Sequence, residues 1–287
     1  MKSLICFVWI LLLNPVLIIA QDNKSCCSTG NHKETKMSFA SFGNDANFRE
    51  SHQLPSDYTL LNPDGKMIKF STGSGKEANA YYIPSTVESN KFILVIHEWW
   101  GLNDNVKREA DELKEKLGNV NILALDLYDG KSATKREDAA QLMQSADADR
   151  IREIFDGALN YAGENAEFGT IGWCFGGGWS LQMSLWLGKK GKACVMYYGI
   201  IDNNKDTFKN LNAPVLGIFA KQDGWVNPEV YGNLEKNIKS AGKTITIKEY
   251  DADHAFANPS NQYFNEEFAN DAKNHVIEFF TNNLMNQ

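Results

Sequence analysis

The segment GTIGWCFGG, residues 169–177, decides the fold class. Its apolar start is typical of the end of a strand, and its glycine-rich part opens a helix, with Cys174 at the turn between Gly172 and Gly176. The G-x-S-x-G pattern, here with cysteine in the serine position, makes a strained turn that exposes a nucleophile and leaves no room for neighbouring Cβ atoms. A helix N-terminus also stabilises a thiolate. We predict that Cys174 is a nucleophile; the alternative is a buried structural cysteine.

Strands and helices alternate on both sides of this turn. Apolar runs predict strands at 67–71, 79–83, 92–96, 122–125, 169–172, 193–198, 215–220 and 244–250. Helical periodicity predicts helices at 105–117 (opened by Asp104), 136–143, 150–161, 177–187, 229–241 and 266–284. The alternation predicts an α/β fold with a mostly parallel central sheet and helices on both faces. Chemistry in such sheets lies beyond the carboxyl ends of the strands, so the residues directly after each strand are the candidates.

Two polar residues follow strands in the order that the α/β-hydrolase fold requires. That fold places nucleophile, acid and histidine in sequence along the chain. Here Cys174 is followed by Asp223, after strand 215–220, and by His254, after strand 244–250. We predict that His254 acts as base and then as acid, while Asp223 fixes its tautomer and stabilises the imidazolium.

Other residues compete for these roles. Asp251 and Asp253 are rival acids, but residues so near His254 in the sequence are less well placed to orient its ring. His97 is the one rival base, because the remaining histidines are expected to be solvated or part of the core: His32, His52 and His275.

The segment His97-Glu98-Trp99-Trp100-Gly101 comes directly after strand 92–96. In this fold, backbone amides of such a loop and of the residue after the nucleophile form the oxyanion hole. We therefore assign the amides of Trp99 and Phe175 to that role. Glu98 either points into the site or is a surface carboxylate, and its spacing leaves both interpretations open.

These motifs together resemble the dienelactone hydrolase family over about residues 58–287. The matching stretches are His97–Gly101, Asp126–Tyr128, Gly172–Gly177, Tyr197–Gly199, Gln222–Asp223 and His254–Ala257. The resemblance implies a Cys174-His254-Asp223 triad. It also implies that Glu98 draws the proton from the resting cysteine, so that the thiolate forms when substrate binds.

The sequence departs from that family at a substrate-binding position. In its best-known members, which hydrolyse dienelactone, an arginine four residues after the catalytic histidine holds the substrate carboxylate; Asn258 stands there in this chain. An uncharged amide cannot give a bidentate, charge-assisted contact. We expect a neutral ester or lactone substrate, with Asn258 and Trp100 as substrate-binding residues. Tryptophans near the motifs either line an aromatic pocket or belong to the core: Trp99, Trp173, Trp179 and Trp225.

The N-terminus predicts export. Lys2, an apolar run and Ala20 indicate a signal peptide at residues 1–20, although Asn14 and Pro15 interrupt the run and an uncleaved membrane anchor is the alternative. A polar extension at 21–57 is expected to wrap around the hydrolase domain at 58–287, pinned by its aromatic residues Phe39, Phe42 and Phe48. We expect a periplasmic or secreted protein with no membrane contact beyond the signal.

Composition, the motifs that are absent and the cysteine positions exclude several classes of function. The net charge of −7 argues against nucleic-acid binding. No dinucleotide fingerprint, Walker motif or metal cluster is visible in the sequence, so we predict neither cofactor nor metal. Cys26 and Cys27 lie in the extension and Cys194 in an apolar strand, so no regular disulfide framework is indicated. We expect a monomeric hydrolase of small esters or lactones; the alternatives are a binding protein on a hydrolase fold and a thiol redox protein using Cys174.

Overall fold

The computed structural model describes residues 42–52, 54, 58–199 and 206–286. The predicted signal peptide, Cys26, Cys27 and Phe39 lie outside the described residues, so the boundaries at residues 20 and 57 stay predictions. The described chain forms one eight-stranded sheet. Its strands are β1 (Lys66–Ser71), β2 (Glu77–Ile83), β3 (Lys91–Ile96), β4 (Asn121–Leu125), β5 (Glu167–Trp173), β6 (Gly191–Tyr197), β7 (Val215–Ala220) and β8 (Ile245–Tyr250).

The strand order is β1-β2-β4-β3-β5-β6-β7-β8. β2 pairs antiparallel with β1 and β4, and every later pairing from β4 to β8 is parallel. The central strands β3, β4 and β7 are almost wholly buried, as expected for parallel strands that helices cover on both sides. The predicted mostly parallel α/β-hydrolase sheet is therefore confirmed.

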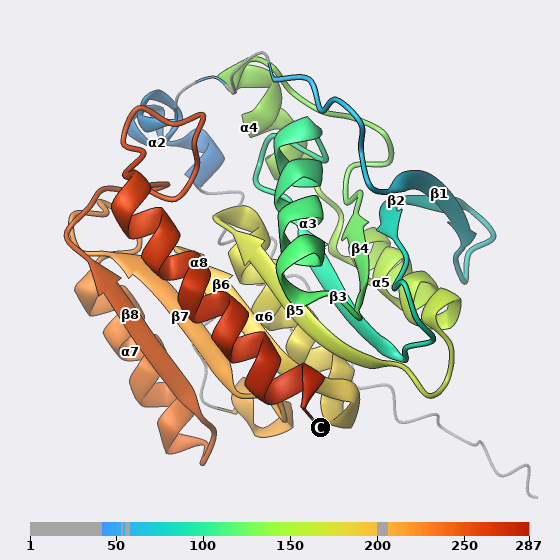
Figure 1. The fold of residues 1–287 in the computed structure, drawn as a ribbon. Coiled ribbons are helices and arrows are strands. Elements are labelled where there is room, and N and C mark those ends of the chain that lie inside the picture. Colours follow the sequence, from blue (N-terminus) through green and yellow to red (C-terminus); the bar gives the residue numbers. More distant parts are fainter. Residues whose placement is uncertain (1–41, 53, 55–57, 200–205, 287) are drawn as a thin grey trace, which may run out of the picture. The chain divides into compact units, whose positions relative to one another are not determined.

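Helices cover both faces of this sheet. They are α2 (Ala46–Ser51), α3 (Asp104–Leu117), α4 (Arg136–Ser145), α5 (Ala148–Ala162), α6 (Phe175–Leu187), α7 (Pro228–Ser240) and α8 (Glu266–Phe280), which continues as a short π-helical turn, Thr281–Met285. Figure 1 shows α3 and α8 side by side in front of the sheet, with α5, α6 and α7 behind it. The short helix α2 contacts α4 at the end of the sheet where the parallel strands terminate.

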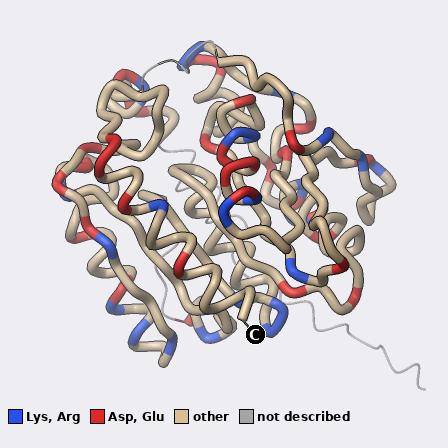
Figure 2. Tube along the Cα trace, viewed as in Figure 1, with Lys and Arg blue, Asp and Glu red and all other residues tan. Residues whose placement is uncertain are grey.

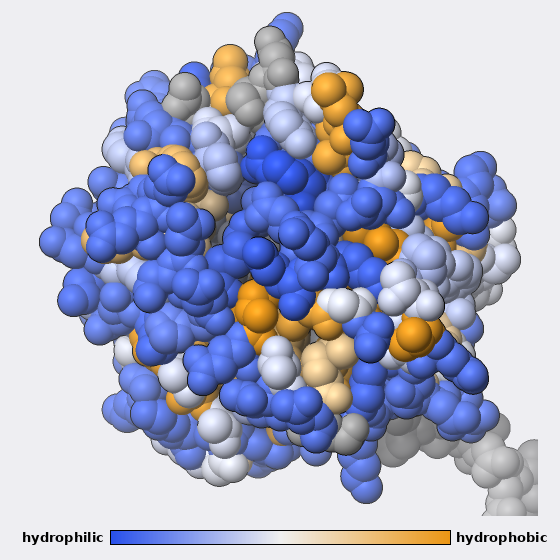
Figure 3. Space-filling view, in the orientation of Figure 1, coloured by the Kyte–Doolittle hydropathy of each residue, from blue (hydrophilic) through white to orange (hydrophobic). Residues whose placement is uncertain are grey.

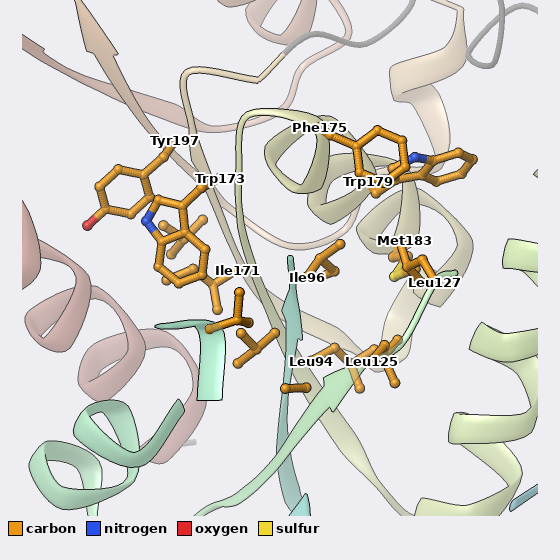
Figure 4. Packing of buried hydrophobic residues seen from close by; sticks show 14 of the residues in the cluster. Leu94, Ile96, Leu125, Leu127, Ile171, Trp173, Phe175, Trp179, Met183 and Tyr197 are labelled. Carbon is orange, nitrogen blue, oxygen red and sulfur yellow. The ribbon is translucent and has the colours of Figure 1, made fainter. Parts of the chain in front are cut away.

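Helix α6 lies in the centre of the core. All but one of its residues are buried, so it has no polar face of the kind that surface helices carry. Figure 4 shows Phe175 and Trp179 of this helix on one side of β5, and Trp173 and Tyr197 together on the other. The rings of Trp173 and Tyr197 stack with centroids 5.5 Å apart. This double-sided packing fixes the carboxyl end of β5, where Cys174 stands.

The surface is polar. Figure 2 shows acidic and basic residues interleaved along α3, and in Figure 3 the hydrophobic patches on the same face are small and separate. Among the described residues, no helix combines the length and apolar character needed to cross a bilayer.

The first turn of α3 differs from the prediction. We expected Asp104 to open the helix, but Asn103 is the N-cap and its side chain accepts a hydrogen bond from the Val106 amide. Asp104 is the first helical residue, and it accepts from the backbone amide of Leu60 and from Lys107. Both residue types favour helix starts, so sequence alone does not separate them.

Candidate active site

Cys174 stands on the predicted strained turn. It has φ +53° and ψ −117°, a conformation that non-glycine residues rarely adopt, and it is the N-cap of α6. A Cβ atom on Gly172 would lie 2.1 Å from the carbonyl oxygen of Gly176, and one on Gly176 would lie 2.3 Å from that of Ile96. Both glycines are therefore required by close backbone contacts, as the sequence pattern predicts.

His254 and Asp223 form a buried pair next to this turn. His254 Nδ1 lies 2.6 Å from Asp223 Oδ2, while Asp223 Oδ1 accepts from the amides of Trp225 (2.8 Å) and Val226 (2.9 Å). Burial by itself would lower the pKa of His254, but the charge and hydrogen bond of Asp223, with Cys174, raise that pKa well above its usual value. His254 is thus held as a strong base whose Nε2 faces away from Asp223.

The rival residues have other partners. The Leu127 amide donates to His97 Nε2 at 3.2 Å, so the proton is on Nδ1, which lies 2.6 Å from the carbonyl oxygen of Glu98. Burial lowers the pKa of His97, which keeps this fully buried ring neutral and structural. Asp251 is exposed and accepts from the Gln222 side chain rather than from His254.

Glu98 is half-buried beside Asn258, whose Nδ2 donates to Glu98 Oε2 at 2.7 Å. Burial raises the pKa of Glu98 to about 7, against the opposing effects of His254 and of the Asn258 hydrogen bond. Asn258 is held in place because its Oδ1 accepts from the backbone and hydroxyl of Ser260. The interpretation of Glu98 as a surface carboxylate is wrong, and Asn258 directs its amide to an enzyme carboxylate.

Two adjoining hollows lead to this carboxylate. The larger, of about 300 Å³, lies between α3 and α8, and the smaller, of about 30 Å³, is lined by Glu98 and Asn258. They share five lining residues: Arg108, Glu109, Trp173, Ala257 and Pro259. Arg108 is already within 3.6 Å of Glu109 and 3.7 Å of Glu112. The positive charge of Arg108 in the larger hollow is therefore already partly neutralised by these two glutamates.

The tryptophans divide between pocket and core. Trp173 lines both hollows, whereas Trp179 is almost wholly buried between Phe175 and Trp186. Trp100 is buried with its ring 4.8 Å from that of Trp99 and lines neither hollow, so its substrate-binding role stays a prediction. Trp99 and Phe175, whose amides are predicted to form the oxyanion hole, lie after β3 and at the first position of α6; that role stays a prediction.

Residues that precede the predicted hydrolase domain cover Cys174. Phe48 lies in α2 and His52 follows directly after this helix, and both are buried. The Phe48 ring packs edge-on against Trp99 and Trp225. The His52 ring lies 5.0 Å from that of His254. His52 Nε2 is 3.9 Å from Cys174 Sγ. Cys174 is consequently only 5% exposed. The extension is pinned by Phe48, as expected.

His52 is the site residue that the sequence did not reveal. We expected it to be solvated or part of the core; it is buried, and it also contacts Cys174, which lies 122 residues away in the sequence. Its Nδ1 lies 2.6 Å from the carbonyl oxygen of Phe48, and burial, with the charge of His254, lowers the pKa of His52 to about 3. The ring is therefore neutral, with the Nε2 lone pair directed at Cys174. The sequence offers one weak signal for His52: it follows a polar segment whose aromatic residues were expected to pack against the domain.

Comparison with known proteins gives consistent matches. Residues 78–284 match the model of the dienelactone hydrolase family. "Protein usf" of Aquifex pyrophilus is 28% identical over 229 residues, which cover 75% of this chain and 97% of the relative. The "Putative carboxymethylenebutenolidase" of Aquifex aeolicus is 27% identical over 206 residues, covering 68% of this chain and 87% of the relative.

Solved structures share the fold. A dienelactone hydrolase-like promiscuous phosphotriesterase from metagenomic libraries is similar with a TM-score of 0.65 and 16% identity, covering 77% of this chain and 99% of the other. An esterase of Pyrococcus furiosus is similar with a TM-score of 0.56 and 17% identity, covering 81% and 98%.

Proposed function

Because this chain belongs to the dienelactone hydrolase family, we propose that it is a cysteine-dependent hydrolase of small carboxylic esters or lactones. The observation that carries the proposal is the strained turn that places Cys174 beside the buried His254–Asp223 pair. A nucleophile, a base and a group that orients the base are the parts that acyl transfer needs.

The mechanism follows from these positions. Glu98 takes the thiol proton, the thiolate of Cys174 adds to the substrate carbonyl, and the amides of Trp99 and Phe175 hold the negative charge on the carbonyl oxygen. His254 then gives its Nε2 proton to the leaving alcohol, which leaves a thioester on Cys174. Water, deprotonated by His254, hydrolyses that thioester, and the released thiolate takes its proton back from Glu98. Asp223 fixes the Nδ1–H tautomer throughout. Substrate reaches Cys174 only when Phe48 and His52 separate from it.

A panel of short esters and lactones tests this proposal, with iodoacetamide as the reagent that separates the alternatives. We expect hydrolysis that disappears as Cys174 is alkylated, and slower alkylation of Cys194, because burial raises the pKa of Cys194 to about 11. A binding protein would hydrolyse nothing. A redox protein would instead form a disulfide from Cys174, but Cys194 contacts Ser180 Oγ at 3.8 Å and is not its partner. Full activity after alkylation of Cys174 would contradict the proposal.

The role of Glu98 gives a pH prediction. With a pKa of about 7, Glu98 is protonated at lower pH and cannot take the thiol proton, so kcat/KM rises as the pH increases through about 7. Glu98→Gln removes that rise and lowers the plateau by about 10²-fold, a typical loss for one proton-transfer group. The measurement is kcat/KM between pH 5 and 9 (roughly the range in which such groups titrate). Glu109→Gln is the control, because burial also raises the pKa of Glu109; it should keep the rise and move it to lower pH, since the charge of Glu109 contributes to the raised pKa of Glu98. An unchanged profile in Glu98→Gln would exclude this role.

Substrate charge gives a second prediction. A substrate carboxylate near Asn258 would face Glu98, and Arg108 in the same hollow already has Glu109 and Glu112 as partners, so no unpaired cation among the described residues that line it would hold the carboxylate. Losing a charge-assisted hydrogen bond costs about 1.5–3 kcal/mol. This corresponds to roughly tenfold to hundredfold in kcat/KM, so a neutral ester should be preferred over a carboxylate-bearing one of matched size by that factor.

Two variants at one position make that measurement decisive. Asn258→Arg should reduce the neutral-to-charged ratio, whereas Asn258→Gln, which adds length without charge, should not. The ratio of the two substrates is compared because an arginine would also favour ionised Glu98 and change both absolute rates. A preference for the carboxylate substrate in the unmodified protein, unaffected by Asn258→Arg, would show that a neutral substrate is the wrong inference.

We further propose that the protein is exported, on the basis of Lys2 and the apolar run that ends at Ala20. We expect the purified mature protein to begin near Gln21 and to be recovered from the periplasm or the medium. Mass spectrometry of the N-terminal peptide checks this. An intact Met1 terminus in the membrane fraction would support the anchor instead.

A further inference from the structure

Three donor atoms converge at the nucleophile. One ring nitrogen of His52, one ring nitrogen of His254 and Cys174 Sγ all lie within 4.8 Å of one another, and the three residues are buried. A thiolate and two imidazoles are donors that Zn²⁺ and other thiophilic cations prefer. We propose that His52, Cys174 and His254 form a binding site for a single thiophilic d¹⁰ cation, represented by Zn²⁺.

Both histidines are oriented as metal ligands. His52 Nδ1 lies 2.6 Å from the Phe48 carbonyl oxygen and His254 Nδ1 lies 2.6 Å from Asp223 Oδ2, so each ring has a proton on Nδ1 and directs Nε2 away from that partner. His52 Nε2 carries a lone pair, and a bound cation would displace the Nε2 proton of His254. A carbonyl or carboxylate on the second ring nitrogen is the arrangement that fixes metal-binding histidines. In the part of the chain that the structure describes, His254 Nε2 is buried and has no hydrogen-bond partner. A cation would satisfy that atom.

The spacing fits a small cation with little adjustment. Zn–S and Zn–N bonds of about 2.3 and 2.0 Å, at angles between tetrahedral and trigonal, place sulfur and nitrogen about 3.5–3.8 Å apart. Cys174 Sγ and His52 Nε2 are 3.9 Å apart. Three protein ligands leave a fourth position for water. The thiolate and the nearby carboxylate of Asp223 balance the two positive charges, as a buried divalent cation requires.

Metal binding has a direct effect on the proposed chemistry. The cation would occupy the lone pairs of both the nucleophile and its base, and it would connect the segment after α2 to the turn at Cys174. Hydrolysis should therefore stop when the site is filled and return when a chelator removes the cation. Binding itself requires no substrate, so the site can be present even if the hydrolase proposal fails, and the reverse also holds.

The test is a titration of the full-length protein, in a background with Cys26→Ser and Cys27→Ser, with Zn²⁺ by calorimetry and with Co²⁺ by absorption. We expect one equivalent bound, with a thiolate-to-cobalt charge-transfer band that is lost in Cys174→Ala. His52→Phe keeps an aromatic ring against Trp99 but removes a ligand, and should weaken binding by more than about 100-fold. Asp223→Asn, which changes only the support of His254, should weaken it by about 10- to 100-fold.

A matched control separates this site from surface histidines. His275 lies on α8 beside Asp271, and His275→Ala should bind Zn²⁺ as tightly as the unmodified protein. Inhibition should follow binding: Zn²⁺ should abolish hydrolysis at concentrations that fill the site, and His52→Phe should shift the inhibiting concentration by the same factor as the affinity. Equal affinity in His52→Phe, no thiolate band, or no bound equivalent would each overturn the proposal and leave His52 as a packing residue.

Discussion

Cys174→Ala should lower kcat/KM for short esters by at least about 10⁴-fold, because no other group can form the thioester. Any residual rate would come from the oxyanion hole and from substrate binding alone. The measurement is steady-state hydrolysis, with thermal unfolding to show that the variant is folded. Alanine at this position still has to adopt the strained backbone conformation of φ +53°, so its stability should not increase.

Cys194→Ala is the matched control for that experiment. Cys194 is also a buried free thiol, but it lies inside β6 next to Ser180 and has no role in the proposed reaction. Its replacement should affect stability more than kcat/KM. A Cys174→Ala protein that keeps most of its activity, next to an inactive Cys194→Ala protein, would contradict the assignment of the nucleophile.

Asp223→Asn should lower kcat/KM by about 10⁴-fold, the loss seen when a triad acid is replaced by its amide. The Oδ1 atom of an asparagine can still accept from the amides of Trp225 and Val226, which directs its NH₂ group at His254 Nδ1. The proton of His254 would then stay on Nε2, and the ring could no longer deprotonate the attacking water. The variant would keep the geometry of the site but would hold His254 in the wrong tautomer.

The pH profile distinguishes this effect from a loss of fold. Asp223 is the main group that raises the pKa of His254 against burial, so Asp223→Asn should move the His254 titration to lower pH. Asp251→Asn is the control, because exposed Asp251 binds Gln222 and should leave the profile unchanged. Equal activity losses in the two variants would show that Asp223 acts only structurally.

The sequence predicts most of the sheet because its strands are apolar and follow one another at regular spacing. Strand β7 lies at the predicted residues, and the other strands differ by one or two residues at their ends. For β5 the sequence predicted only the tail of the strand, 169–172. α6 starts two residues early, since the glycines after Cys174 are part of the helix.

The candidate site could be predicted only where residues follow strands. Asp223 and His254 were placed by that rule, and the structure brings them within hydrogen-bonding distance. The contact of Asn258 with Glu98 spans 160 residues, and that of His52 with Cys174 spans 122. Neither has a periodic signal, because each depends on how a loop or a polar extension docks onto the finished fold.

The two outer strands of the sheet affect how copies of this protein meet in solution. An open edge can recruit a strand from another molecule, and charged side chains along the edge oppose such recruitment. Exposed Lys66 and Lys69 lie on β1, and Lys248 and Glu249 lie on β8. A second copy that extended the sheet would have to bring these charges out of water. We therefore expect these charges to oppose edge-to-edge aggregation of the folded protein at high concentration, while the monomeric state stays a prediction.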